Sequence, residues 1–369
     1  MPPEDPFRLP RAVEPEHYDL TLAPDLASAS FTGEERVRVR VHQATAEVVL
    51  NAAELDIHAA ELVTADGAVL GGQVRYHDED ERVAVQLDQA APVGVHTLRL
   101  RFSGTLNDKL RGFYRSHYTD DSGTAHVIAT TQFEATDARR AFPCWDEPDR
   151  KATFRVSLVV ERPLTAISNS EVVERVDLGN GKDEVRFAET MRMSTYLVAF
   201  IVGPLEATAA VDVDGVPLRV VAVPGKQRLA GFALEVAAHS LRMFSRYFAI
   251  PYPATKLDLV ALPDFAMGAM ENLGAVTFRE SALLVDPERA TRAELERVAD
   301  VVCHEIAHMW FGDLVTMKWW NGIWLNEAFA TFMEMTCTDA FRPEWQRWVD
   351  FGLSRSAAFD TDSLGATRP

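Results

Sequence analysis

The feature that most constrains the fold is a change of hydrophobic period near residue 205. Between about residues 18 and 205, apolar and polar residues alternate in short runs, for example over residues 36–41 and 97–102. A period of two indicates half-buried strands. Many short strands separated by Gly and Asp are typical of an antiparallel sandwich or a saddle-shaped sheet.

Beyond that point the pattern becomes mixed. Apolar residues recur every three or four positions over 230–244, which predicts an amphipathic helix. Residues 256–262 read as a strand and 292–310 as a long helix. Since one core stops growing at roughly 250–300 residues, the 369 residues favour two closely packed domains. We therefore expect an α+β chain with an N-terminal antiparallel β domain over 1–205 and an α+β domain over 206–369.

Charge and cysteine content restrict the possible partners and location. With 55 acidic against 37 basic side chains the net charge is −18, which argues against nucleic acid and anionic lipid as partners. The apolar runs are far shorter than the roughly 20 residues that span a bilayer. Cys144, Cys303 and Cys337 lie far apart, so we expect reduced thiols. These patterns, together with an N-terminus unlike a secretory signal, predict a cytoplasmic protein.

The strongest chemical signal is the pattern His-Glu-x-x-His at His304, Glu305 and His308. In a helix the two histidines lie one turn apart on one face, so both imidazoles can reach one ion. Glu305 then projects beside them, where it can act on water at the same site. The pattern is typical of zinc peptidases, and an ordinary helix that carries two histidines is the alternative interpretation.

A hydrolytic zinc site needs a third protein ligand. Glu327 follows His308 by nineteen positions, within a second helical pattern over 324–332. Two antiparallel helices joined by a loop with Gly312 and Gly322 would bring this glutamate beside the histidines. We therefore expect one Zn²⁺ per chain, held by His304, His308 and Glu327.

A second motif points to the position of cleavage. Residues 267–272, Met-Gly-Ala-Met-Glu-Asn, follow a strand and are too polar and glycine-rich for a core strand. Such a segment can leave its edge free to pair with an extended peptide. Glu271 would supply a carboxylate to the cleft, although a loop with an exposed glutamate remains the alternative.

Taken together, these motifs resemble the zinc aminopeptidases of the aminopeptidase N family, which share a gluzincin site with leukotriene hydrolase. The resemblance extends over the whole chain. Its remaining motifs are residues 9–10, 15–20, 112–116, 131–148 and 193–200. It implies an N-terminal β saddle followed by a thermolysin-like α+β catalytic domain, and peptides with a free N-terminus as substrates.

The resemblance also implies a role for each site residue. His304, His308 and Glu327 match zinc ligands, and Glu305 matches the general base. Glu134 and Glu271 match the two carboxylates that hold the α-ammonium, and Gln132 matches a polar residue beside them. The other substrate-binding positions lie along the strand that meets the substrate: Met267, Gly268, Ala269, Met270 and Asn272. Glu334, seven residues after Glu327, is expected either to hydrogen-bond a ligand histidine or to be solvated.

The sequence departs from this family in one respect. Family members carry a tyrosine tens of residues beyond the glutamate ligand and then a large helical domain, whereas no tyrosine follows Tyr252 here. We therefore expect a truncated catalytic domain without the usual oxyanion donor. Two alternatives stay open: a weak or inert zinc-binding fragment, and an epoxide hydrolase resembling leukotriene hydrolase. The preferred first residue and the oligomeric state are undetermined.

Overall fold

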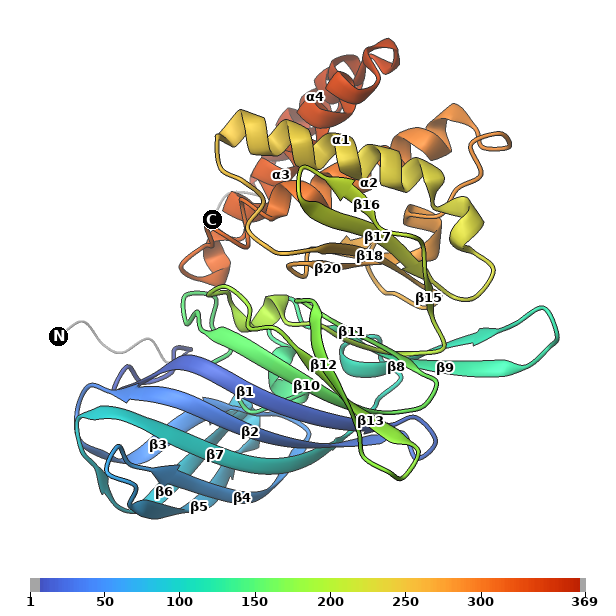
Figure 1. Cartoon of the computed structure of the whole chain (residues 1–369). Coiled ribbons are helices and arrows are strands. Elements are labelled where there is room, and N and C mark those ends of the chain that lie inside the picture. Colours follow the sequence, from blue (N-terminus) through green and yellow to red (C-terminus); the bar gives the residue numbers. More distant parts are fainter. Residues whose placement is uncertain (1–6, 366–369) are drawn as a thin grey trace.

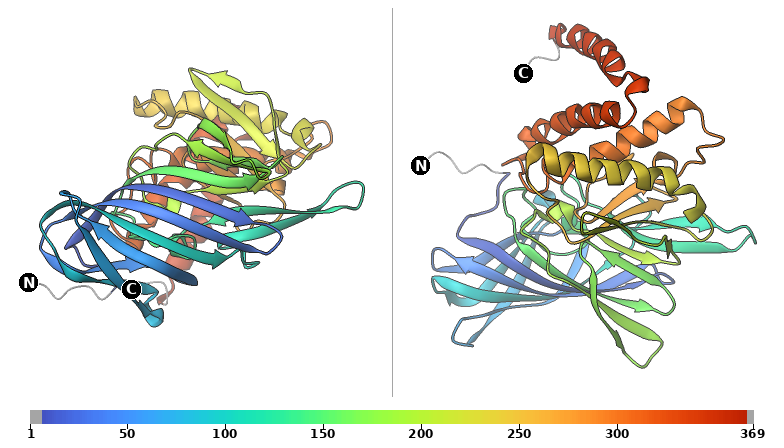
Figure 2. Two further views of the ribbon diagram at one scale, coloured as in Figure 1. Left: turned by 60° about the horizontal axis from the view of Figure 1, so that its bottom comes forward. Right: turned by 45° about the horizontal axis from the view of Figure 1, so that its top comes forward.

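The structure is a computed structural model that describes residues 7–365. The chain is α+β, as predicted: strands dominate its first part and helices dominate the end of its second (Figure 1). Two sheets form the first part and a third sheet lies beneath the helices of the second (Figures 1 and 2). The site described below lies where these two parts meet.

The largest sheet has the strand order β12-β13-β10-β1-β2-β7-β4-β5-β6-β3. Its described pairs are antiparallel except for β1 with β10, which is parallel. Buried and exposed residues alternate along β2, so its valines face the core, as the period of two predicts. The strands are β1 (Val13–Asp25), β2 (Ser30–Val41), β3 (Thr45–Asn51), β4 (Leu55–Val63), β5 (Val69–His77), β6 (Arg82–Ala91), β7 (Gly94–Thr105), β10 (Thr153–Glu161), β12 (Val172–Asp177) and β13 (Lys182–Phe187).

The second sheet is smaller and packs on an aromatic core. Its order is β11-β14-β9-β8, formed by β8 (Gly112–Thr119), β9 (Ala125–Gln132), β11 (Thr165–Ser168) and β14 (Phe200–Gly203). Phe200 contacts Phe113, Phe133 and Phe142 with ring centroids 5.8–6.2 Å apart. Edge-to-face packing of this kind fixes the end of β9, from which the chain enters the site.

The third sheet supports the helices. Its order is β15-β17-β18-β20-β19, with β16 beside β17. Every residue of β18 is buried, because this strand has parallel neighbours on both sides and is covered on both faces. The strands are β15 (Glu206–Ala207), β16 (Val211–Val213), β17 (Val216–Ala222), β18 (Leu257–Leu262), β19 (Ala269–Met270) and β20 (Ala275–Arg279).

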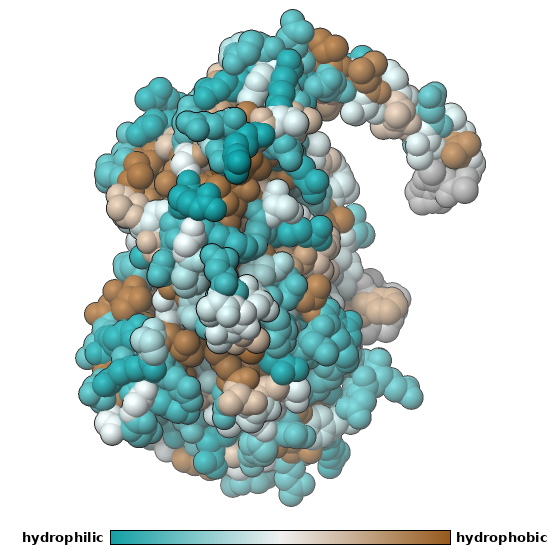
Figure 3. All heavy atoms as spheres, turned by 90° about the vertical axis from the view of Figure 1, so that its right-hand side faces the viewer, coloured by the Kyte–Doolittle hydropathy of each residue, from teal (hydrophilic) through white to brown (hydrophobic). Residues whose placement is uncertain are grey.

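Four α-helices follow in the described part of the chain: α1 (Gly231–Phe248), α2 (Arg292–His308), α3 (Trp324–Phe341) and α4 (Arg347–Asp362). Thr291 and Glu294 form a capping box that starts α2. No residue of α4 is buried, and this helix projects from the body (Figures 1 and 3). None of the described helices is long and apolar enough to cross a bilayer.

Short 3₁₀ turns connect the remaining elements: η1 (Asp78–Asp80), η2 (Ala138–Arg140), η3 (Thr195–Leu197), η4 (Gln227–Leu229), η5 (Glu280–Ala282), η6 (Trp320–Gly322) and η7 (Pro343–Trp345). The division that we predict at residue 205 would fall between β14 and β15. It stays a prediction.

A buried hydrogen bond joins the two parts. Asn169 donates through Nδ2 to the carbonyl oxygen of Leu273 in the second part, 2.9 Å away, and to that of Leu197 in its own part, 2.7 Å away. Gly274, the next residue, has φ +76°, and a Cβ there would lie 2.1 Å from the Asn169 carbonyl oxygen. Only glycine therefore lets the two backbones approach so closely.

Candidate metal centre and substrate cleft

The helix pair α2 and α3 brings His304, His308 and Glu327 together. His304 Nε2 lies 3.0 Å from His308 Nε2 and 3.3 Å from Glu327 Oε2. His308 Nε2 lies 3.7 Å from the same oxygen. The spacing of the histidines in α2 and the return of the chain in α3 thus place three ligand atoms around one point.

The other ring nitrogens indicate which nitrogens carry protons. His304 Nδ1 lies 3.0 Å from Glu334 Oε2, and His308 Nδ1 lies 3.0 Å from the Phe311 carbonyl oxygen. Both partners are acceptors, so each neutral ring donates through Nδ1 and leaves a lone pair on Nε2. When both rings are neutral, two such lone pairs 3.0 Å apart repel each other, and a cation between them removes that repulsion.

The three distances also suit one small ion. Ligand atoms about 2.0–2.1 Å from a tetrahedral zinc ion are about 3.3 Å from one another, and the distances here are 3.0, 3.3 and 3.7 Å. Imidazole nitrogen and carboxylate oxygen are both common zinc donors. The set therefore fits a zinc ion in size and in chemistry.

A cluster of carboxylates adjoins this set. Glu134 follows β9, Glu271 follows β19, and their carboxylates lie within 4.8 Å of that of Glu327. Oε1 of Glu134 and Oε1 of Glu271 are buried without a hydrogen-bond partner among the described residues. Burial, and then the neighbouring carboxylates, raise the pKa of Glu134 and of Glu271. An unpaired cluster of acceptors of this kind is ready to hold a cation.

Glu305 lies next to His304 in α2 and is buried. Burial raises its pKa well above the usual range, and the carboxylates of Glu271 and Glu327 act in the same direction. A raised carboxyl pKa is typical of side chains that exchange protons near neutrality. The position of Glu305 beside the ligand atoms is therefore chemically suited to proton transfer.

These groups surround a pocket of about 270 Å³ at the junction of the two parts. Nine predicted site residues line it: Glu134, Met267, Gly268, Ala269, Glu271, His304, Glu305, His308 and Glu327. It is also lined by Val301 and Glu334. Val301 went unnoticed in the sequence, although it lies three positions before His304 on the same helical face.

Three predicted residues lie behind this lining. Gln132 is buried and its Nε2 lies 3.3 Å from Met270 Sδ. Asn272 is also buried and donates to Thr277 Oγ1 at 3.1 Å. Neither of these side chains nor that of Met270 is part of the pocket wall, so their contact with a substrate stays a prediction.

The edge of the third sheet borders the pocket. β19 is the last strand of this sheet and pairs only with β20 among the described strands. Its other edge carries backbone groups that an extended peptide can pair with. Met267, beside this edge, has 56% of its surface exposed.

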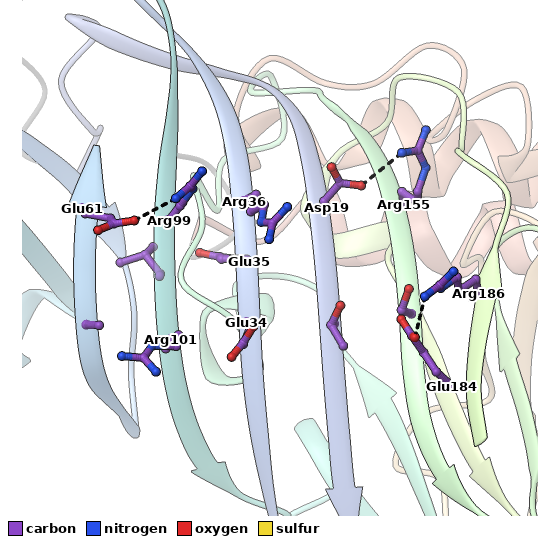
Figure 4. A pocket seen from close by; sticks show the side chains of 14 residues that line it. Asp19, Glu34, Glu35, Arg36, Glu61, Arg99, Arg101, Arg155, Glu184 and Arg186 are labelled. Atoms are coloured by element: carbon purple, nitrogen blue, oxygen red, sulfur yellow. Dashed lines mark hydrogen bonds and ion pairs between the residues drawn. The ribbon is translucent and has the colours of Figure 1, made fainter. Parts of the chain in front are cut away.

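A larger hollow of about 700 Å³ lies on the large sheet (Figure 4). Its wall consists mostly of charged side chains, several of which pair with one another, such as Arg99 with Glu61 at 3.1 Å. Arg155 with Asp19 and Arg186 with Glu184 are similar pairs. No close set of metal ligands lies there among the described residues, so this hollow lacks the chemistry of the smaller pocket.

A helix pair that presents His-Glu-x-x-His and a later glutamate, packed against a β domain, defines a metallopeptidase-type architecture. Comparison with known families agrees. Residues 14–197 match the peptidase M1 N-terminal domain and residues 232–369 match the peptidase family M1 domain. The chain belongs to peptidase family M1.

Named relatives are similar over nearly the whole chain. Aminopeptidase M1-A of Oryza sativa subsp. japonica is 47% identical over 98% of this chain and 42% of its own length. The puromycin-sensitive aminopeptidase of Caenorhabditis elegans is 46% identical over 93% and 36%. Endoplasmic reticulum aminopeptidase 1 of Homo sapiens is 40% identical over 100% and 39%. The chain thus spans about two fifths of the length of these relatives.

Proposed function

We propose that this chain carries the metal centre and the N-terminus-binding cleft of a zinc aminopeptidase. The observation that supports this most strongly is the adjacency of two acceptor sets. The His304–His308–Glu327 set fits one zinc ion, and the carboxylates of Glu134 and Glu271 lie beside it with unpaired oxygens. The relatives include an aminopeptidase M1-A and a puromycin-sensitive aminopeptidase, whose names agree with this activity.

The carboxylates would fix where a peptide is cut. A free α-ammonium has three N–H donors, and the unpaired oxygens of Glu134 and Glu271 can accept from it. Holding the ammonium at this end leaves only the first peptide bond near the ligand set. The free edge of β19 would keep the following residues extended. An endopeptidase needs no such anchor.

The chemistry would be shared between the metal and Glu305. When bound, zinc lowers the pKa of water and polarises a carbonyl group. Glu305 would accept the proton released from attacking water and deliver it to the departing amine nitrogen. Glu334 and the Phe311 carbonyl oxygen would hold the two imidazoles with Nε2 toward the ion.

The proposal extends to location. The three cysteines are free thiols, as is usual in a reducing compartment, and this supports a cytoplasmic setting. The names of the relatives favour peptides over an epoxide as substrate. A zinc-binding chain without turnover is the remaining alternative.

Metal content and turnover measured together test the proposal. We expect one zinc per chain, and hydrolysis of an alanyl chromogenic anilide but not of its N-acetylated form. Glu327→Ala should lower the zinc content. Glu344→Ala is the control, because Glu344 lies in η7, beyond the end of α3. One zinc without turnover would support the inert alternative, and undiminished zinc in Glu327→Ala would remove this residue from the ligand set.

A further inference from the structure

A second cluster of side chains lies where α1, α2 and α3 meet, and none of its members lines the pocket. Cys303 and Cys337 are buried and free, and both thiols contact the same hydroxyl group. Ser240 of α1 lies between them, with Oγ 3.3 Å from Cys303 Sγ and 3.4 Å from Cys337 Sγ. Helices α1, α2 and α3 each contribute one residue to this cluster, and the three helices lie together above the third sheet in Figure 1.

The cluster fits oxidation better than metal binding. The described residues offer two sets of three or more close metal ligands, and neither set includes a cysteine. The shared contact with Ser240 Oγ, in contrast, already holds the two sulfur atoms near each other. The remaining requirement for a disulfide is an oxidant that can reach one of them.

A route to the cluster leads past His239. This residue lines a hollow of about 760 Å³ on the outer face of α1, together with Phe341 and Met243. His239 also lowers the pKa of the Cys337 thiol, so the two side chains are close to each other. The hollow is therefore the side from which a small oxidant would approach Cys337.

Cys337 is the better nucleophile on chemical grounds. Although burial raises the pKa of Cys337, its neighbours Cys303, His239 and Ser240 lower it to about 6, whereas burial raises the pKa of Cys303 well above its usual value. A substantial thiolate fraction then exists near neutral pH. Cys337 is also removed from the metal-ligand set, whereas Cys303 directly precedes His304.

We propose that Cys303 and Cys337 form a reversible disulfide when the chain meets hydrogen peroxide. The Cys337 sulfur attacks one peroxide oxygen, the O–O bond breaks, and hydroxide leaves as a sulfenic acid forms. The Cys303 sulfur then attacks the Cys337 sulfur, the S–OH bond breaks, and water leaves. In total, two thiols and one peroxide give one disulfide and two waters, so sulfur is oxidised and peroxide is reduced.

The bond would connect the helices that carry the proposed zinc ligands. Cys303 adjoins His304 in α2, and Cys337 lies one turn beyond Glu334 in α3. The disulfide would therefore tie α2 to α3 beside the hydrogen bond of His304 with Glu334. Neither this bond nor its detection requires that the chain be an active peptidase.

Mapping of the thiols in the native chain tests the proposal. The reduced chain is treated with hydrogen peroxide, quenched, alkylated under denaturing conditions, digested and analysed by mass spectrometry. We expect a peptide pair that joins Cys303 to Cys337, lacks two hydrogen atoms and separates on treatment with dithiothreitol. Cys144 is the internal control, because it is equally buried but lies in the first part of the chain and should stay alkylated.

Two variants complete the experiment. Cys337→Ser should abolish the linked pair and leave Cys303 open to alkylation, whereas Cys144→Ser should leave the link unchanged. Several results in the wild-type chain would overturn the proposal: no linked pair, a link that forms only in denaturant, oxidation of Cys337 that ends at sulfinic acid, or equal oxidation of Cys144.

Discussion

The carboxylate of Glu334 lies 3.0 Å from Nδ1 of His304 and thereby sets the orientation of this imidazole. The two residues come from different helices, α3 and α2, so their contact also positions one helix against the other. A carboxylate behind a ligating histidine holds the ring and raises its basicity. Glu334 is therefore a positioning residue in the proposed zinc centre.

Glu334→Ala should weaken zinc binding by about 10- to 100-fold, because the imidazole loses the group that orients it. The measurement is competition with a chelator of known affinity. Asp339→Ala, at a half-buried carboxylate on the same helix, is the control and should bind zinc like the unaltered chain. Equal affinities in all three proteins would contradict the role of Glu334.

Glu305→Gln should separate metal binding from proton transfer. The amide keeps the size of the side chain but cannot accept the proton from water, so we expect zinc content to stay unchanged. Where turnover of an alanyl anilide is present, it should fall by at least about 10²-fold. Retained turnover would show that another group is the base.

Glu271→Ala should act on substrates according to their N-terminus. With one anchor lost, the KM for peptides with a free α-ammonium should rise about 10-fold or more, since hydrogen bonds to charged groups contribute roughly 1.5–3 kcal/mol. N-acetylated peptides lack the cation, and their inhibition constants, measured as competitors of anilide hydrolysis, provide the comparison. An equal change for both kinds of peptide would argue against ammonium binding by Glu271.

Gly274→Ala should destabilise the chain at the contact between its two parts. The new Cβ would meet the Asn169 carbonyl oxygen at 2.1 Å, and φ is +76°, so we expect a loss of about 3 kcal/mol or more in the free energy of unfolding. Gly225→Ala is the matched control, with φ +83° and open space around it, and should lose only about 1 kcal/mol. Equal losses in urea unfolding would indicate that the close approach is unimportant.

Glu35 should make stability depend on pH. The side chain is 2% exposed, neither oxygen has a partner among the described residues, and burial raises its pKa well above 4.5. The folded chain therefore keeps the proton while the unfolded chain loses it above about pH 4.5. The resulting stability is fully present below that pH and is lost, by up to about 1.4 kcal/mol per unit, as pH rises toward the folded pKa.

Glu35→Gln should remove this dependence. The free energy of unfolding of the variant minus that of the unaltered chain should increase from pH 5 to pH 8, because only the unaltered chain loses stability over this range. Glu34→Gln, at the exposed neighbour on β2 (Figure 4), should show no such trend. Parallel pH profiles for the unaltered chain and Glu35→Gln in urea unfolding would refute the argument.

The sequence was sufficient for the parts of the fold that local periodicity determines. The spacing of His304 and His308 predicted a helix, and α2 contains both. The second helical pattern placed Glu327 near them, as the distances confirm. Alternation along β2 likewise implies that Glu35 faces inward together with Val37.

Contacts between segments far apart in the sequence could not be predicted from these local patterns. The parallel pairing of β1 with β10 depends on strands more than a hundred residues apart. The approach of Cys303 and Cys337 to the same hydroxyl group depends on how α2 and α3 are rotated about their axes, and the sequence predicted only that the cysteines are reduced thiols. The absence of a partner for Glu35 depends on all the strands around it.

The carboxylate cluster has one member from each part of the chain that the junction joins: Glu134 follows β9 in the first and Glu271 follows β19 in the second. Recombination between two related genes, with a crossover anywhere between these codons, would take the two residues from different parent genes. A hybrid would keep the cluster only if its halves had retained the same mutual orientation. Selection for a working pocket therefore acts on the contact between the two parts as much as on the pocket residues. The two parts should therefore be inherited as a single unit.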